Sequence, residues 1–409
     1  MRVRGARVAV VGGSIAGCAT ALAAARAGAG EVVVYERAAD GLQDRGVGLA
    51  VHDDRYTELA AAGQLGPDVP WRRLTRRPWI VRDGAAPAGR VVGVLPFPFR
   101  SYNWGSLWRE SRAGLPASVG YVRGSAVERV LPEPGGAVLR FADGRTERFD
   151  LVVGADGYRS AVRAATRAAT VPAYAGYLAW RGTLPVELLP GPRDAWPEHD
   201  AATVTFPGGH MIVYRIPGPG GHGTSANWVF YTAPPAALGP ALRDPTSLPA
   251  GTVTDELVSH HAAVVEEHFP PYWQEVVRRT PRSGTYVQPI YDLAVPHYGE
   301  GRLVLAGDAA AVARPHSGSG AVKALQDAAV LERVLREAPD LDAAVRAYDA
   351  ERSPTGRAVV DVGRRLGHAQ VRATPDWAAM DQEAVEEWWR TSADGGRGFG
   401  GHALTGPGE

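Results

Sequence analysis

The sequence predicts an α/β protein, in which a mostly parallel sheet flanked by helices is interrupted by an inserted, mainly antiparallel sheet. Three short apolar runs, residues 8–11, 151–153 and 303–305, each lead directly into a glycine-containing turn, as buried parallel strands do. Between the second and third runs, clusters of β-forming residues alternate with Pro/Gly loops, which is typical of antiparallel strands. A length of 409 residues favours two domains.

The first element is a β-turn-α-β unit of the Rossmann type. Strand residues 8–11 are followed by the turn Gly12-Gly13-Ser14-Ile15-Ala16-Gly17, an Ala-rich helix and a second strand that ends at Glu36. A helix N-terminus offers free amides to a pyrophosphate, and a carboxylate after the second strand can accept ribose hydroxyls. The expected nucleotide-binding residues here are Gly12, Ser14, Ile15, Ala16, Glu36 and Arg37. Ser14 replaces the middle glycine of the usual pattern, so a turn without a ligand is the alternative.

Two later turns carry an aspartate at a strand end. The second cluster is Gly154-Ala155-Asp156-Gly157, and the third is Gly307-Asp308-Ala309-Ala310 with its continuation Pro315-His316-Ser317-Gly318-Ser319-Gly320. We expect the Asp156 carboxylate to accept hydrogen bonds from backbone amides and shape its loop. Asp308 suits a polyhydroxyl ligand, with a turn-capping role as the alternative.

The domains are expected to be interleaved along the chain. Residues 1–75, 100–165 and 284–375 are predicted to form the nucleotide-binding domain, and residues 76–99 and 166–283 the inserted substrate-binding domain. After the second cluster the chain is expected to form the strands of the inserted domain. It then returns to the nucleotide-binding domain with the strand that begins near residue 301. Residues 391–409 are rich in Gly and polar side chains, which predicts a disordered tail.

Composition excludes several other classes of protein. Lys plus Arg equals Asp plus Glu, at 44 each, so no nucleic-acid partner is expected. No run is long enough to span a membrane, the N-terminus lacks a signal peptide pattern, and we expect a cytoplasmic protein. The single cysteine, Cys18, excludes an internal disulfide and is expected to pack within a helix. We expect no metal site, because His260 and His261 are adjacent on a predicted helix and point apart.

Taken together, the three clusters resemble the single-component aromatic hydroxylases of the flavoprotein monooxygenase family, typified by para-hydroxybenzoate hydroxylase. The resemblance runs from about residue 8 to residue 352. It implies FAD as cofactor, NAD(P)H as transient reductant, and hydroxylation of a small electron-rich aromatic molecule with O2 through a flavin hydroperoxide. It also fits a monomer or homodimer. A shorter resemblance, carried by Tyr174-Ala175-Gly176-Tyr177-Leu178-Ala179-Trp180-Arg181-Gly182, Arg314-Pro315-His316 and Lys323, is to the 2,6-dihydroxypyridine 3-hydroxylase group of that family.

The resemblance implies roles for individual residues. Asp156 would lie near the pyrophosphate and Asp308 would bind the ribitol hydroxyls. The amides of Ser319, Gly320 and Ala321 would face the flavin pyrimidine edge, and Pro315 would form part of the wall beside the ring. Arg45, Val47 and Val127 fall where further FAD contacts are expected. The chain departs from the family at Ala311 and Arg314, which replace a histidine and a proline.

The candidates for proton transfer are His316, beside the expected flavin wall, and then His210 from the insert. Tyr177, Tyr214 and Tyr286, with Trp180, are candidates for the substrate pocket wall, each with core packing as the alternative. Arg159 and Arg163 could meet NAD(P)H, with a solvated position as the alternative. No second glycine-rich fingerprint for a nicotinamide cofactor is present.

Three questions stay open in the sequence. The same fold also supports epoxidation, Baeyer-Villiger-type oxygenation and halogenation, although the tryptophan-rich halogenase signature is missing. A flavin-binding redox sensor without turnover is the alternative from another class. Trp388 and Trp389 lie on an amphipathic segment that could form a subunit interface or cover the protein's own core.

Overall fold

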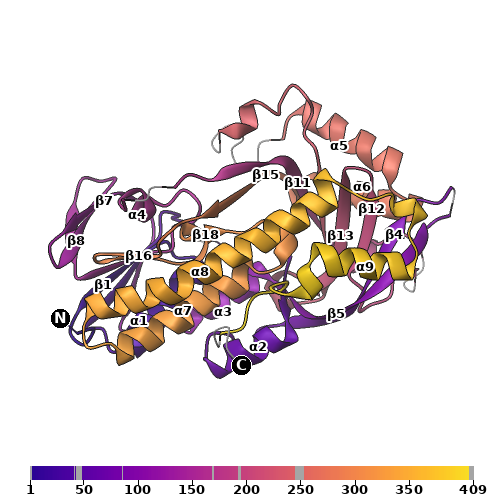
Figure 1. Ribbon diagram of the computed structural model, residues 1–409. Coiled ribbons are helices and arrows are strands. Elements are labelled where there is room, and N and C mark those ends of the chain that lie inside the picture. The colour runs from indigo at the N-terminus through magenta and orange to yellow at the C-terminus, as the bar shows by residue number, and fades with distance from the viewer. Residues whose placement is uncertain are drawn as a thin grey trace.

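The computed structural model describes residues 2–40, 42, 48–84, 86–167, 170–191, 195–244 and 253–404. It contains a six-stranded sheet, a nine-stranded sheet and a small three-stranded sheet, with a long pair of helices crossing the molecule (Figure 1). The predicted combination of a parallel and an antiparallel sheet is therefore confirmed.

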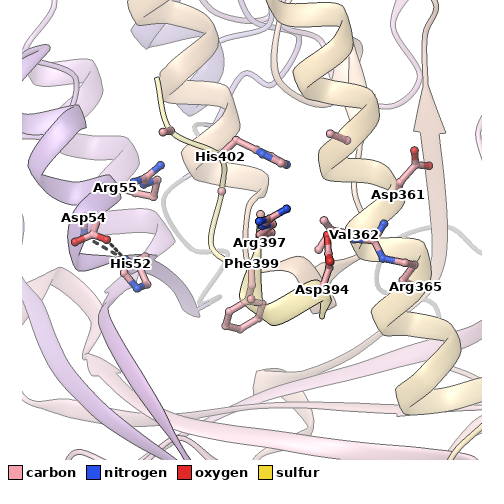
Figure 2. A pocket seen from close by; sticks show the side chains of 15 residues that line it. His52, Asp54, Arg55, Asp361, Val362, Arg365, Asp394, Arg397, Phe399 and His402 are labelled. Atoms are coloured by element: carbon pink, nitrogen blue, oxygen red, sulfur yellow. Dashed lines mark hydrogen bonds and ion pairs between the residues drawn. The ribbon is translucent and has the colours of Figure 1, made fainter. Parts of the chain in front are cut away.

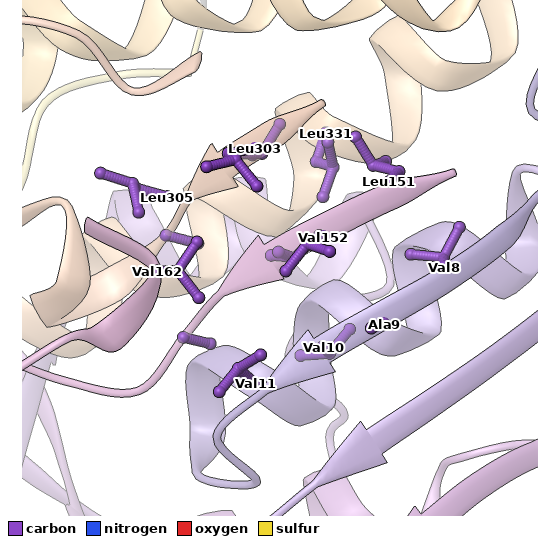
Figure 3. Close-up of a cluster of buried hydrophobic side chains, with 14 of the residues drawn as sticks. Val8, Ala9, Val10, Val11, Leu151, Val152, Val162, Leu303, Leu305 and Leu331 are labelled. Carbon is purple, nitrogen blue, oxygen red and sulfur yellow. The ribbon is translucent and has the colours of Figure 1, made fainter. Parts of the chain in front are cut away.

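The six-stranded sheet is built around the β-turn-α-β unit. Its order is β16 (Gly299–Glu300), β17 (Leu303–Leu305), β10 (Leu151–Gly154), β1 (Arg7–Val11), β2 (Glu31–Tyr35) and β6 (Val119–Val122). All neighbours are parallel except the β16–β17 pair. Figure 3 shows side chains of β1, β10 and β17 packed into one apolar core, which is continuous with the helices α1 (Ile15–Arg26), α7 (Gly320–Glu337) and α8 (Leu341–Gly367). The three predicted turns consequently open at the same sheet edge.

The nine-stranded sheet supplies the other half of the molecule. Its order is β18 (Ala311–Val312), β15 (Thr285–Ala294), β11 (Ala173–Pro185), β14 (Thr224–Thr232), β13 (Gly209–Pro217), β12 (Ala202–Phe206), β4 (Trp71–Val81), β5 (Arg90–Asn103) and β3 (Gly48–His52). Only the β12–β4 pair is parallel. Because side chains alternate along a strand, Leu178 and Trp180 of β11 face the helices α5 (Asp255–His268) and α6 (Pro271–Arg278), and Tyr177 and Ala179 face the opposite side.

The remaining elements pack against the two sheets. The strands β7 (Val127–Glu133), β8 (Gly136–Phe141) and β9 (Thr146–Phe149) form the small sheet, whose Phe141 and Phe149 pack edge-on against Tyr35 of β2. The other helices are α2 (Asp53–Ala61), α3 (Trp104–Ala113), α4 (Ala161–Ala164) and α9 (Gln382–Ser392). The free cysteine, Cys18, is buried.

The large sheet extends past the residue ranges predicted for the inserted domain. It includes β3 and β15, which the sequence analysis places in the nucleotide-binding domain. An apolar strand pattern shows that a strand is buried but does not show which sheet receives it. In the described part of the chain, no helix combines the length and hydropathy that a membrane crossing needs.

The prediction of a disordered tail is wrong for residues 391–404. Phe399 contacts the rings of Phe97, Phe99 and Trp389, at centroid distances of 6.1, 5.4 and 4.9 Å. The Gly400 amide donates to the Ser317 carbonyl at 2.8 Å. Figure 2 shows this segment lying between α2 and α8. A single aromatic anchor and backbone hydrogen bonds thus order a stretch whose composition is otherwise polar; residues 405–409 lie outside the described part.

The tryptophan pair of α9 covers the protein's own core. Trp79 of β4 lies 5.0 Å from Trp388 and 6.2 Å from Trp389, and it stacks on Trp377 at 5.3 Å. Of the two alternatives for this segment, the structure shows the intramolecular one.

Candidate functional site

The glycine turn after β1 is held by backbone geometry and by a buried carboxylate. Gly12 has φ +100°, and a Cβ at this position would lie 2.4 Å from the Ala155 carbonyl oxygen. The Gly13 amide donates to Glu36 at 2.7 Å, and the Ala38 amide donates to the other oxygen of Glu36 at 2.8 Å. Each of these oxygens retains a further lone pair for a ligand hydroxyl. Glu36 therefore shapes the turn and remains able to accept from a ribose.

Two aromatic residues that the sequence analysis missed complete this turn. Trp108 Nε1 and the Tyr121 hydroxyl both donate to the Gly13 carbonyl, at 2.9 and 2.8 Å. No local motif marks them, because they arrive from α3 and β6. Among the other predicted residues of the unit, Ile15 is buried, Ser14 caps α1 without a side-chain hydrogen bond, and Arg37 is exposed. A Cβ on Gly307 would approach Ala16 to 2.7 Å, so the first and third turns meet here.

The two predicted aspartates differ in how far their hydrogen-bonding capacity is used. The Asp156 carboxylate accepts from the Ala161 amide at 2.7 Å, as expected for a loop-shaping residue, while its Oδ1 is buried without a partner. Asp308 makes no hydrogen bond within the described residues. Burial raises the pKa of the Asp308 carboxyl, yet the side chain remains accessible to solvent. An accessible carboxylate with unused hydrogen-bonding capacity suits a polyhydroxyl ligand.

A buried ionic network fixes the turn that carries Asp308. Lys323 Nζ lies 2.8 Å from the Gly307 carbonyl and 2.7 Å from Asp327, and Arg352 Nε lies 2.8 Å from the other oxygen of Asp327. The Gly307 amide also donates to Asp327 at 2.9 Å. Burial lowers the pKa of Lys323 and the Asp327 carboxylate opposes that shift. Lys323 stands out in the sequence only through a resemblance, and no local pattern marks Asp327 or Arg352.

The helix α7 begins directly after the predicted flavin wall. Its N-cap, Ser319, donates to the Ser317 carbonyl at 3.0 Å and does not cap the helix with its side chain. The first-turn residues Gly320 and Ala321 are at least partly exposed. The positive end of α7 is therefore accessible at Gly320 and Ala321, whereas Ser319 is buried and its amide donates to the Ser317 hydroxyl at 3.3 Å.

The two predicted histidines meet in the interior. His316, in the turn Pro315–Ser317, lies with its ring 5.2 Å from that of His210 of β13 and 4.2 Å from that of Tyr231 of β14. His316 Nε2 is hydrogen-bonded to the Tyr177 hydroxyl at 2.9 Å, and its Nδ1 is buried without a partner. His210 Nδ1 lies 3.3 Å from the Gln370 carbonyl. Tyr231 was not predicted, because no local motif marks it.

Electrostatics keep both histidines neutral. Burial, with Arg77 nearby, lowers the pKa of His210 to about 3. Burial also lowers the pKa of His316 well below its usual value, and the charges of His210, Arg314, Arg77 and Arg181 act in the same direction. Burial raises the pKa of the Tyr177 phenol. At neutral pH this group of residues thus holds a neutral imidazole hydrogen-bonded to a protonated phenol.

Arg181 is a deep cation without an acidic partner. It lies on the same face of β11 as Tyr177, and within the described residues it forms no ion pair and its Nε has no hydrogen-bond partner. Burial acts to lower the pKa of Arg181, but the phenols of Tyr286, Tyr231 and Tyr214 leave it raised. A buried charge normally has a counterion. This arrangement therefore suits an anionic oxygen on a bound molecule.

The structure brings most of the predicted pocket residues together and separates others. Tyr177, Tyr214 and Tyr286 lie on one face of the large sheet around Arg181. Trp180 is wrong as a wall residue, because it points to the opposite face and contacts His261 at 4.4 Å. Val127 begins β7 and packs against the core of the parallel sheet. Arg45 and Val47 lie outside the described residues.

The two predicted arginines also differ. Arg163 is wrong both as a nucleotide contact and as a solvated residue, since it is buried and donates to the carbonyls of Thr170 and Ala309 at 2.9 and 3.0 Å. Arg159 is exposed, and its guanidinium lies 5.2 Å from the centroid of the Tyr158 ring.

The three turns fit a dinucleotide cofactor of the FAD type. The free amides at the start of α1 suit a phosphate. The unpartnered Asp156 Oδ1 and the accessible Asp308 suit hydroxyl groups, and the positive end of α7 suits a ring edge that gains negative charge on reduction. Fold and site thus define a flavoprotein with a second, mainly antiparallel sheet.

Comparisons with known proteins agree that this chain is a flavoprotein. Two family models match, "FAD binding domain-like" over residues 174–292 and "FAD binding domain" over residues 278–362. The 3-amino-4-hydroxybenzoate 2-monooxygenase of Streptomyces cremeus is 32% identical, covering 89% of this chain and 87% of its own. The 2,6-dihydroxypyridine 3-monooxygenase of Paenarthrobacter nicotinovorans is 29% identical over an alignment that covers 88% of this chain and 90% of the relative. The structure of 2,6-dihydroxypyridine-3-hydroxylase from Arthrobacter nicotinovorans superposes with a TM-score of 0.80 at 25% identity, over 99% of both chains. The chain belongs to the class A FAD-dependent aromatic monooxygenases.

Proposed function

We propose that this monooxygenase takes electrons from NAD(P)H and hydroxylates a small hydroxylated pyridine or benzoate-type ring that binds as an oxyanion beside Arg181. The relatives support this substrate class by name, since they include a dihydroxypyridine, an aminohydroxybenzoate and a 6-hydroxynicotinate monooxygenase. The observation that carries the proposal is the uncompensated Arg181 on the same sheet face as the Tyr177–His316 pair.

The cofactor would be held by the three turns already described. Gly12, Ser14, Ile15, Ala16 and Glu36 would bind the adenosine diphosphate half, with Arg37 and Val127 nearby. Asp156 and Asp308 would bind the central part, and Pro315, Ser319, Gly320 and Ala321 would flank the ring. When bound, FAD supplies the redox chemistry and oxygen activation.

The protein's own residues would prepare the ring for attack. Neutral His316 can accept a proton from a ring hydroxyl, directly or through the Tyr177 hydroxyl, because burial keeps its imidazole unprotonated. The Arg181 guanidinium would stabilise the oxyanion that results. Tyr214, Tyr231 and Tyr286 would form apolar walls that exclude water, and His210 would hold His316 in place by ring contact. An ionised ring hydroxyl makes the ring electron-rich, which favours transfer of an electrophilic oxygen.

The test is aerobic NADPH and NADH oxidation with a panel of hydroxylated pyridines and benzoates, followed by product analysis with labelled oxygen. We expect ligand-stimulated oxidation and one labelled oxygen in the ring product. His316→Gln should lower kcat by roughly a hundredfold or more. Arg181→Gln should raise KM about tenfold to a hundredfold, with partial recovery in Arg181→Lys and no change in the exposed control Arg282→Gln. No stimulated oxidation by any ring would contradict the proposal, and an epoxide product would replace hydroxylation with another oxygenation.

A further inference from the structure

A second, strongly cationic cleft lies beside the Tyr177–His316 pair. It has a volume of about 740 Å³ and runs between the start of β11, residues 239–243 and the end of α8. The charged and titratable residues that line it are Arg243, Arg314, Arg364, Arg372, His368 and Tyr174. No acidic side chain is among its lining residues in the described part of the chain.

The positive charge of this cleft exceeds what the surrounding carboxylates neutralise. Arg314 and Arg364 share the single buried carboxylate of Asp292, at 2.8 and 2.7 Å, and Arg364 also reaches Asp361 at 3.2 Å. Arg243 and Arg372 form no ion pair and donate no hydrogen bond within the described residues, and both are exposed. Guanidinium groups concentrated in a concave site attract anions and match the geometry of phosphate oxygens.

A ladder of aromatic rings continues from the cleft. Tyr174, which lines it, contacts Tyr291 at 5.6 Å, and Tyr291 stacks on Tyr158 at 6.4 Å with an interplanar angle of 9°. Arg159 lies over the outer side of this ladder. Tyr158 and Tyr174 are partly exposed, so guanidinium groups lie next to aromatic rings that a nucleotide base could contact.

We propose that this cleft binds the diphosphate of the nicotinamide dinucleotide reductant, with Arg243 and Arg372 as its main phosphate contacts. The inference rests on the proposed use of NAD(P)H. A diphosphate carries at least two negative charges, which matches the two arginines that form no ion pair within the described residues. A single ring substrate with one charge does not need this many cations, and its oxygenation requires a dry pocket instead of an open cleft.

The position of the cleft suits a reductant. Arg314 lines it, precedes Pro315 in the chain, and has its guanidinium 5.7 Å from the centroid of the Tyr177 ring. A dinucleotide held by its phosphates at this place would have its nicotinamide end within reach of the turn that carries Pro315 and His316. The cleft and the buried group are separate sites that share this one residue.

The test compares the holoenzyme with the Arg243→Gln/Arg372→Gln double variant and with Arg129→Gln, an exposed arginine of the small sheet, as matched control. FAD content and circular dichroism establish that each variant is folded. We expect KM for NADPH or NADH to rise about tenfold to a hundredfold in the double variant, with kcat at saturation and KM for the aromatic substrate unchanged. Raising the salt concentration should weaken nucleotide binding in the wild type and less in the double variant.

Titration of the holoenzyme with inorganic pyrophosphate separates this inference from the proposed function. Normal turnover with an unchanged nucleotide KM in the double variant would overturn the inference and leave the function in place. A rise only in the KM of the aromatic substrate would also overturn it, and would identify the cleft as the substrate entrance. Failure of both nucleotides to reduce the enzyme would overturn the proposed reductant. In that case weaker pyrophosphate binding in the double variant would support a phosphate site, and unchanged binding would refute it.

Discussion

The buried histidine pair makes stability depend on pH in a direction that the structure fixes. His210 has a pKa of about 3 in the folded protein, compared with about 6.5 for an ordinary histidine. The unfolded chain therefore binds more protons below pH 6.5, and stability is lost as the pH falls from about 6.5 towards 3. Each pH unit below the ordinary pKa lowers the free energy of unfolding by about 1.4 kcal/mol. At pH 4.5, about two units below 6.5, His210 alone should therefore lower the free energy of unfolding by about 2.7 kcal/mol.

The variant His210→Gln isolates this contribution. A glutamine can still donate to the Gln370 carbonyl and carries no charge, and its presence also relieves the repulsion that His210 exerts on His316. We expect the wild type to lose at least about 2 kcal/mol more than the variant between pH 7 and pH 4.5. The assay is urea unfolding of the holoenzyme at several pH values, followed by tryptophan fluorescence.

His222→Gln is the control, because His222 is exposed and its substitution should leave the pH profile unchanged. Parallel profiles for the wild type and His210→Gln would refute the reasoning, since they would mean that the folded protein accommodates a charged imidazole at this position.

Three further predictions concern other parts of the molecule. Lys323→Met leaves a buried Asp327 with one cation fewer, so we expect a loss of about 3–5 kcal/mol in unfolding free energy and weaker FAD retention; normal FAD absorbance and stability would contradict it. Gly13→Ala places a Cβ 2.2 Å from the Tyr121 hydroxyl, and should abolish FAD binding as measured by the flavin spectrum, whereas an unchanged spectrum would show that the turn can move. Phe399→Ala removes the aromatic anchor of the tail, so trypsin should release residues after Arg390 faster than in the wild type, and equal cleavage rates would argue against the anchor.

The three turns of the cofactor-binding region could be predicted from short stretches of the sequence. Gly12, Asp156 and Asp308 each stand within a few residues of a strand end, and their chemistry follows from backbone geometry that the neighbouring residues dictate. Helix N-termini and strand ends carry the same dipoles and free amides in any fold that contains them. For this reason the three turns and their parallel strands could be predicted from the residues, and the family resemblance that the turns carry added FAD as the cofactor.

Only the tertiary structure decided the other half. Arg181 meets tyrosines from three other strands of the large sheet, and the strand order and register that bring them together leave no local sign. The same holds for Asp327 between two cations, for the cationic cleft and for the tail, whose composition predicts disorder while one phenylalanine anchors it. Such features depend on side chains that are far apart in the chain and on the free energy of burying them together. Local propensity and periodicity indicate that a side chain is buried, whereas the packing of the fold determines which other side chains it contacts.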